Sequence, residues 1–293
     1  MTPTPEQPRI AGAPISWGVC EVPGWGYQLA PDAVLPQMRE AGLSATEFGP
    51  DGFLPAAPGD KAAALAGHGL AAVGGFVPVV LHEAAHDPLP DVDRAIDGFL
   101  AAGADSLVLA AATGTDGYDA RPRLDADQWT VLLANLDRLR EHAAQRAVTA
   151  SLHPHVGTLV ETAEEVDRVL QGSEMPLCLD TGHLLVGGAD PRTFTRAAAG
   201  RIAHTHLKDV DGVLAEQVVC GALAYSEAVA TGLYRPLGHG DVDLAGILDD
   251  LVKAGYSGWY VLEQDVMLAA APEGEGPLAD VRVGVAFIRD RLG

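Results

Sequence analysis

Side chains that can bind metal follow four apolar runs in the second half of the chain. These runs end in the segments SLHPHVG, LCLDTGH, AHTHLKD and YVLEQD. The residues concerned are His153, Asp180, His206 and Glu263. Two imidazoles and two carboxylates suit Mn²⁺, Co²⁺, Zn²⁺ or Fe²⁺ better than Ca²⁺, and they lack the thiolates of a structural zinc site. The pattern predicts a site for a divalent metal ion.

Eight short apolar runs alternate with segments of helical period and predict the elements that position these residues. The predicted strands are Ile10–Val19, Ala45–Phe48, Ala71–Val80, Ser106–Ala110, Val148–Leu152, Leu177–Leu179, Ile202–Leu207 and Trp259–Leu262. The predicted helices are 31–42, one that begins at Asp60 and ends near Gly67 or Gly69, Asp91–Ala102, Asp125–Ala144, Thr158–Leu170, Pro191–Ala199, Asp243–Ala254 and Leu278–Leu292. Continuous apolar runs are typical of parallel strands that are covered on both faces. We therefore predict an α/β fold, a (β/α)₈ TIM barrel.

The barrel brings the four candidate ligands together, because the carboxyl ends of its strands converge on one face. Each residue also has an ordinary structural explanation. A histidine after a strand is often structural, Asp180 can cap the next helix, and Glu263 can pair with a neighbouring Lys or Arg. Since all four would have to be structural at once, in consecutive strands, we favour the metal site.

The chain length agrees with one domain, because a (β/α)₈ barrel takes about 250 residues. We expect residues 1–8, which are rich in proline, to form a flexible lead-in, and residues 9–293 to form the barrel domain. An open Rossmann sheet is disfavoured, because no GxGxxG follows the first strand. The segment Val210–Arg235 is an insertion after strand seven with a predicted helix at Gly221–Thr231, either functional or decorative.

Composition excludes several classes of function. A net charge of −21 disfavours nucleic acid and anionic membrane partners. The chain has 3 cysteines without a CxxC spacing, no signal-peptide pattern and no long apolar run, which favours a cytoplasmic protein. Cys178 lies in an apolar run and is expected in the core. GxSxG, P-loop and HExxH motifs are absent from the sequence, so serine hydrolysis, nucleotide phosphoryl transfer and zincin chemistry have no support. The apolar content of the YSGWYV segment and of the insertion suggests a homo-oligomer.

Further polar and aromatic residues at strand ends are candidates for substrate contact or proton transfer. They are Trp17, Glu47, His82, Glu83, His155, His183, Lys208 and Asp209. Lys208 can reach a substrate oxygen, or Asp209 beside it can neutralise its charge. Each residue can equally be a surface or capping residue.

Several segments spread over nearly the whole chain resemble the sugar phosphate isomerase/epimerase superfamily of xylose isomerase-like barrels, and within it the inosose dehydratase branch. The segments are APISWG, TEFGPDGFLP, HPHVGT, CLDTGH, HTHLKD, YRPLGHGDVDL and GYSGWYVLEQD. DTGH, HLKD and a terminal Glu are shared across the superfamily. The combination of HPHVGT, PLGxGxVD and EQD is more specific to the dehydratase branch.

The resemblance implies that Asp180, His206 and Glu263 bind a metal, with Mn²⁺ as the first expectation. The superfamily usually has Glu where this chain has His153, so whether His153 ligates directly stays open. His183 and Lys208 are implied to contact substrate, and Trp17 and His155 are further candidates for that role.

The resemblance also implies a reaction that begins by removing a proton next to a carbonyl, with the metal stabilising the enediolate. Loss of the adjacent hydroxyl makes the protein a lyase that dehydrates a keto-cyclitol such as 2-keto-myo-inositol. Reprotonation makes it an isomerase or epimerase of a keto sugar. The base is Glu47 or Glu263, and the acid is His183 or Lys208. A third possibility is a sugar-binding barrel without catalysis.

Overall fold

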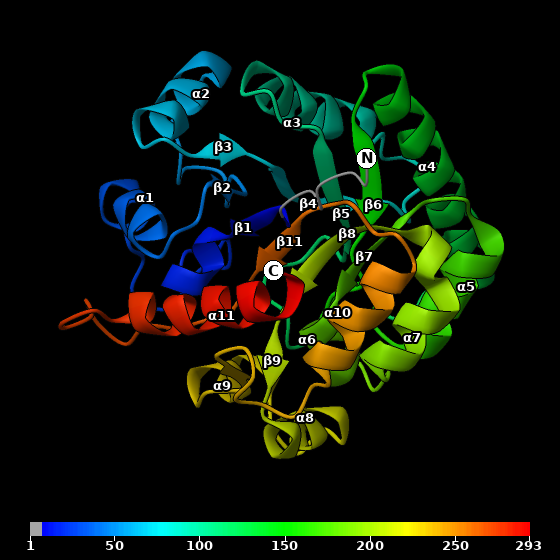
Figure 1. Ribbon diagram of the computed structural model, residues 1–293. Coiled ribbons are helices and arrows are strands. Elements are labelled where there is room, and N and C mark those ends of the chain that lie inside the picture. The colour runs from blue at the N-terminus through cyan, green and yellow to red at the C-terminus, as the bar shows by residue number, and fades with distance from the viewer. Residues whose placement is uncertain (1–7) are drawn as a thin grey trace, which may run out of the picture.

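The computed structural model describes residues 8–293, which form a ring of short strands surrounded by helices (Figure 1). Apart from Pro8, the predicted lead-in lies outside the described residues. The strands are β1 Ile10–Gly12, β2 Ala45–Thr46, β3 Ala71–Ala72, β4 Gly74–Val80, β5 Ser106–Ala112, β6 Thr149–Leu152, β7 Leu177–Asp180, β8 Ile202–Leu207 and β11 Tyr260–Leu262. They pair in parallel in the order β3-β2-β1-β11-β8-β7-β6-β5-β4.

The ring is closed by one strand that changes partner at Val73. Its N–H donates to the carbonyl of Thr46 on β2, and its carbonyl accepts from the N–H of Ser106 on β5. β3 and β4 are thus two parts of the predicted strand Ala71–Val80, and they form the two ends of the sheet order. The predicted (β/α)₈ TIM barrel is confirmed.

The helices pack around the outside of the ring, except for those of the insertion after β8, which lie at one end of the molecule (Figure 1). They are α1 Pro31–Glu40, α2 Pro58–Gly67, α3 Leu89–Ala101, α4 Ala126–Gln145, α5 Ala163–Gly172, α6 Thr181–Val186, α7 Pro191–Ala198, α8 Gly212–Val219, α9 Tyr225–Ala230, α10 Leu244–Lys253 and α11 Pro277–Leu292. Two helices, α4 and α5, begin with a capping box, in which Asp125 pairs with Gln128 and Thr162 pairs with Glu165. Since none of the described helices is long and apolar enough to cross a bilayer, no membrane-spanning helix is found in this part of the chain.

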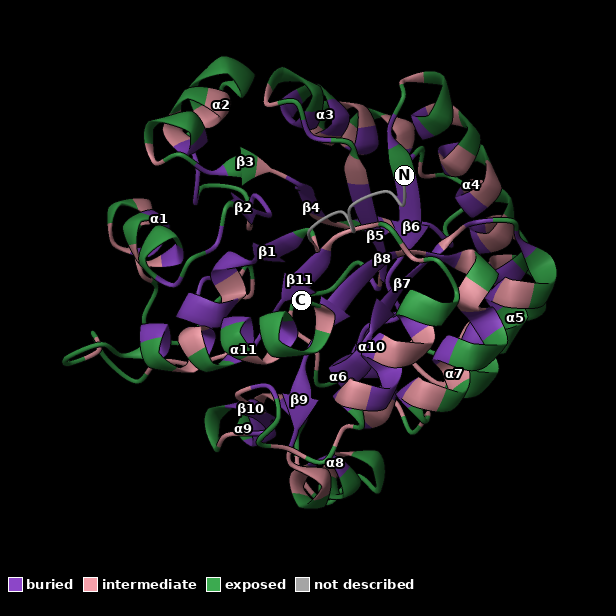
Figure 2. Ribbon diagram, viewed as in Figure 1, coloured by how far each residue is buried: buried purple, intermediate pink, exposed green. Residues whose placement is uncertain are grey.

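The core lies in the barrel and beneath the helices, where Figure 2 shows buried strands and helices that are exposed on their outer faces. On β5, every residue from Leu107 to Ala111 is buried. Both faces of such a strand are covered, which explains why its sequence is apolar throughout instead of alternating.

The first predicted strand is too long. The sheet pairing of β1 ends at Gly12, and Pro14–Trp17 forms a short 3₁₀ helix where Ile10–Val19 was predicted as one strand. Pro14 has no N–H for a strand ladder, and Gly18 at φ 78° ends the 3₁₀ turn.

The insertion after β8 contains two helices, α8 and α9, where the sequence predicted one helix at Gly221–Thr231. Asp211 caps α8, because its side chain accepts from the N–H groups of Val213 and Leu214. A two-stranded antiparallel pair, β9 Asp209–Val210 with β10 Tyr234–Arg235, closes the insertion at its base. Figure 1 shows α8, α9 and β9 at the same end of the molecule.

Gly74 stands at the point where the closing strand changes partner. Its φ is 131°, and a Cβ built there would lie 1.7 Å from the carbonyl oxygen of Ser106. Because that oxygen belongs to the neighbouring strand, relief would require β4 and β5 to separate.

We predict that Gly74→Ala destabilises the protein by about 2–4 kcal/mol, the combined cost of backbone strain and overpacking. The control is Gly59→Ala in α2, where a Cβ meets nothing within 4 Å. The free energy of unfolding of both variants is measured by urea denaturation. An unfolding free energy for Gly74→Ala equal to that of Gly59→Ala would contradict this explanation of ring closure.

Candidate metal centre

Four neighbouring strands position the candidate ligands. β6, β7, β8 and β11 lie side by side in the sheet. The register pairs Asp180 with His206 across β7 and β8, and the N–H of Glu263 donates to the carbonyl of Leu207 on β8. His153 follows β6 directly, and its N–H donates to the carbonyl of Leu109 on β5. The chain therefore places all four side chains at the carboxyl ends of adjacent strands.

Asp180, His206 and Glu263 lie close enough to share a cation. Each offers a ligand atom, and these atoms lie within 4.8 Å of one another. Nδ1 of His206 is 3.2 Å from Oε2 of Glu263 and 3.7 Å from Oδ2 of Asp180. Within the described chain this nitrogen is buried and has no hydrogen-bond partner.

The two carboxylate oxygens of Asp180 have separate surroundings. Oδ1 accepts from the N–H groups of Gly182 and His183 and caps α6. Oδ2 lies 3.1 Å from Nε2 of His153 and 3.6 Å from Nζ of Lys208. Asp180 thus caps a helix and still has one oxygen for the cluster, so the two explanations of this residue are compatible.

His153 lies at the edge of the cluster. It belongs to a group of potential ligands with Asp180 and His183, whereas Glu263 groups with Asp180 and His206. Burial lowers the pKa of His153 to about 4, so its imidazole is neutral near pH 7 and can donate a lone pair.

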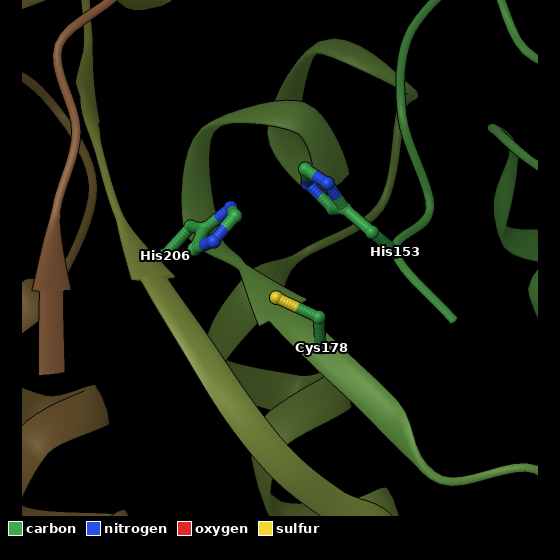
Figure 3. Close-up of side chains that lie close together, drawn as sticks. All are labelled: His153, Cys178 and His206. Atoms are coloured by element: carbon green, nitrogen blue, oxygen red, sulfur yellow. The ribbon is translucent and has the colours of Figure 1, made fainter. Parts of the chain in front are cut away.

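Cys178 also lies beside the cluster. Figure 3 shows its thiol between the side chains of His153 and His206. Burial, followed by the carboxylates of Asp180 and Glu47, holds the thiol pKa well above its usual value. The thiol stays protonated and fully buried, in agreement with the core position expected from the sequence.

Lys208 supplies the cationic charge inside the cluster. Its ammonium is 2.7 Å from Oε2 of Glu263 and also contacts Asp265. Burial alone would lower the pKa of Lys208, but the carboxylates of Asp265, Glu263 and Asp180 raise it well above its usual value. The residue is 2% exposed and stays charged.

Glu47 and His204 lie in the barrel interior next to His206. Oε1 of Glu47 is 2.8 Å from Nε2 of His204 and 2.9 Å from Nε2 of His206. Burial would raise the pKa of Glu47, but His206 and His204 together hold it well below its usual range. Glu47 is therefore an ionised, buried carboxylate.

The rings of His155 and His183 lie against each other beside His153, with their planes tilted by 34°. Their ring centroids are 3.7 Å apart. Burial holds the pKa of both rings well below its usual value. His153 lowers the pKa of His155 further, and His155 lowers that of His183 further. Nε2 of His183 is buried without a hydrogen-bond partner among residues 8–293, and it lies 3.6 Å from Oδ2 of Asp265.

The structure does not bring every sequence candidate to this cluster. The indole N–H of Trp17 donates to Gln37 on α1, and its ring packs in the main hydrophobic core. His82 lies 4.0 Å from Glu83, which is an exposed carboxylate. Asp209 accepts from the N–H groups of three residues in the chain that follows β10, and so has a structural role.

Sequence reasoning did not single out several residues that line the cluster. The insertion supplies two buried phenols, Tyr225 and Tyr234, whose oxygens are 3.1 Å apart. Tyr225 also lies 3.2 Å from Asp265, and Tyr234 lies 3.4 Å from Nδ1 of His183. The aromatic residues of the insertion were the feature of the sequence that could have pointed to these two tyrosines. Trp25 from another loop packs in the same apolar cluster as both tyrosines.

The donor set fits a divalent metal ion. Among the described residues of the cluster, carboxylates outnumber the single ammonium of Lys208. Unpartnered ring nitrogens of His153 and His206 are also buried here. Oxygen and imidazole donors of this kind suit Mn²⁺, Zn²⁺, Co²⁺ or Fe²⁺. The residues that could hold the ion are Asp180, His206 and Glu263, with His153 beside them.

Comparison with known proteins identifies relatives along most of the chain. The family model "Xylose isomerase-like TIM barrel" matches residues 35–291. The rhizopine catabolism protein MocC of Rhizobium meliloti is 34% identical over 273 residues, covering 88% of this chain and 81% of that protein. An inosose dehydratase of Geobacillus kaustophilus is 30% identical over 270 residues, covering 88% of this chain and 87% of that enzyme.

Solved structures share the fold at lower identity. An L-ribulose 3-epimerase aligns with a TM-score of 0.70 and 19% identity, covering 97% of this chain and 94% of that one. The IolI protein with a bound zinc atom aligns with a TM-score of 0.70 and 14% identity, covering 97% and 99% of the two chains. The family match, the relatives and the closed parallel barrel agree, and the chain belongs to the xylose isomerase-like TIM barrel family.

Proposed function

We propose that this protein is a metal-dependent hydro-lyase that removes water from a keto-cyclitol such as 2-keto-myo-inositol. One observation carries the proposal. Cation-binding donors and proton-transfer groups, Lys208 and His183, share one buried cluster at the carboxyl face of the barrel. Relatives named inosose dehydratase, 27–30% identical over most of the chain, support the substrate class.

The metal role belongs to Asp180, His206 and Glu263, with His153 as the fourth donor. A divalent ion held there, Mn²⁺ as the first choice, would act as a Lewis acid that stabilises negative charge on the substrate carbonyl oxygen. The protein holds these donors on adjacent strands of a rigid barrel, which favours precise placement.

Proton removal next to the carbonyl is assigned to Glu263. Its carboxylate is 5% exposed and lies on the same side of the cluster as Lys208, at 2.7 Å. Glu47, the other candidate base, already accepts two imidazole hydrogen bonds on one oxygen. We assign the role of base to Glu263 because its carboxylate lies beside Lys208, the proposed proton donor.

Departure of the hydroxyl as water requires a proton donor. Lys208 is a charged ammonium, and His183 presents a buried nitrogen without a partner among the described residues. We assign the donor role to Lys208, which carries its proton, whereas the low pKa of His183 leaves that ring neutral. His155 and His183, with the tyrosines of the insertion, form a wall that can hydrogen-bond substrate hydroxyls.

An isomerase or epimerase of a keto sugar is the second candidate. The same carboxylate and ammonium can return a proton to the enediolate instead of expelling water. A sugar-binding barrel without catalysis is the third candidate, and it predicts that sugar binds after the metal is stripped.

Two further expectations stay predictions. Self-association is one, and the exposed Val213 and Val219 on α8 are apolar groups that could take part in it. A cytoplasmic location is the other.

The purified protein is expected to contain about one divalent ion per chain by elemental analysis. Asp180→Asn and Glu263→Gln each remove a ligand charge. The loss of metal affinity should exceed the roughly 10- to 100-fold loss caused by changing an outer hydrogen-bond partner. Asp137→Asn is the control, because Asp137 holds Ser173 and Glu174 outside the cluster. Unchanged metal content in both ligand variants would contradict the site.

Metal-loaded protein mixed with 2-keto-myo-inositol should develop the absorbance of an enol-diketone, with turnover in the usual range of about 1–10³ s⁻¹. Solvent deuterium distinguishes the alternatives. Deuterium in a product that has lost no water indicates the isomerase or epimerase. Absence of both signals with Mn²⁺ and Co²⁺ would overturn the lyase proposal.

Tyr225→Phe and Tyr234→Phe should each raise KM about 2- to 10-fold, because each loses one hydrogen bond to a substrate hydroxyl. Metal affinity should not change. Tyr256→Phe is the matched control, since its hydroxyl donates to the carbonyl of Trp259 away from the cluster. If the site variants keep the wild-type KM, the tyrosines do not contact substrate.

A further inference from the structure

A buried carboxylate connects two histidines of β8 across the barrel interior. His204 and His206 are two residues apart on one strand, so both side chains point to the same face. Glu47 follows β2, which is separated from β8 in the sheet by β1 and β11. Its contacts with the two rings therefore cross the interior, and all three residues are at most 2% exposed.

The hydrogen-bond geometry selects the tautomer of His206. Oε1 of Glu47 lies 2.8 Å from Nε2 of His204 and 2.9 Å from Nε2 of His206. One carboxylate oxygen can accept from both rings but could donate to only one, so this geometry favours a hydrogen on Nε2 of His206. With its hydrogen on Nε2, the ring can offer the lone pair of Nδ1 to a bound metal ion. Nδ1 is the nitrogen that faces Glu263 at 3.2 Å and Asp180 at 3.7 Å.

We propose that Glu47 is a positioning residue that prepares His206 to bind the metal through Nδ1. The carboxylate accepts from Nε2–H, which fixes the ring orientation and the tautomer. His204 donates to the same oxygen at 2.8 Å and thereby holds the carboxylate in place. The inference rests on the proposed metal site, but it does not depend on which reaction follows.

Two other roles for this trio are possible. Glu47 could be the base that takes the substrate proton. Alternatively, Glu47, His204 and His206 could themselves bind a second metal ion, since their ligand atoms lie within 4.8 Å of one another. Both alternatives make predictions that differ from those of a positioning residue.

The test compares Glu47→Gln with wild type in metal affinity, metal stoichiometry and turnover at saturating metal. Metal affinity should fall about 10- to 100-fold, the usual effect of losing an outer carboxylate partner. Saturating metal should restore kcat to within about 10-fold of wild type. The matched control is Asp93→Asn, because Asp93 also accepts from an imidazole, His142, but on the helix surface.

A second variant keeps the test informative if Glu47→Gln does not fold. His204→Leu removes one donor to Glu47 and should weaken metal binding less than Glu47→Gln does. ¹⁵N spectra of labelled histidine in the protein loaded with diamagnetic Zn²⁺ should assign the hydrogen of His206 to Nε2 and show the shift of a metal-bound nitrogen at Nδ1.

The inference is overturned by any of three results. Unchanged metal affinity in Glu47→Gln, with kcat lower by 10²- to 10⁴-fold, would make Glu47 the base. Two ions per chain, with one lost in His204→Leu, would make the trio a second metal site. A hydrogen on Nδ1 of His206 in the Zn²⁺-loaded protein would exclude the proposed tautomer. The metal measurements test this inference even if the protein dehydrates no cyclitol, so failure of the proposed reaction would not by itself overturn it.

Discussion

The structure depends on balancing charges that are buried at one end of the barrel. Asp180, Glu263 and Asp265 surround the ammonium of Lys208, and each of these four residues is at most 6% exposed. Each isolated ion would cost several kcal/mol to bury. The cluster is therefore stable only when opposite charges and hydrogen bonds compensate for this cost. Lys208 and the imidazole of His206, whose pKa the carboxylates of Glu263 and Glu47 hold well above its usual value despite burial, balance part of this negative charge. The proposed metal ion would take over the role of the His206 proton.

The barrel meets this need for charge compensation by giving the two polar atoms of one side chain different partners. Asp180 uses one oxygen to cap α6 and directs the other to the cluster. His206 directs Nε2 to Glu47 and leaves Nδ1 for the ligand side. Such a division requires fixed backbone positions, and adjacent parallel strands supply them. The insertion then covers the cluster with Tyr225 and Tyr234.

Much of this arrangement was predictable from sequence, because strand ends in a barrel converge whatever the loops do. Asp180, His206 and Glu263 follow apolar runs directly, and their proximity follows from topology. His204 was missed, although its spacing from His206 places both on one face. Tyr225 and Tyr234 depend on how the insertion folds back, which periodicity does not determine. The first strand was overextended because an apolar run does not show where ladder pairing stops.

The central claim is that Asp180, His206 and Glu263 form a single metal site whose imidazole ligand is oriented from behind by Glu47. A crystal structure of the Mn²⁺-loaded protein, with anomalous data at the manganese edge, tests it most directly. The account predicts one anomalous peak per chain, bonded to Nδ1 of His206 and to both carboxylates. A peak between Glu47, His204 and Nε2 of His206, or none in the cluster at saturating Mn²⁺, would contradict it.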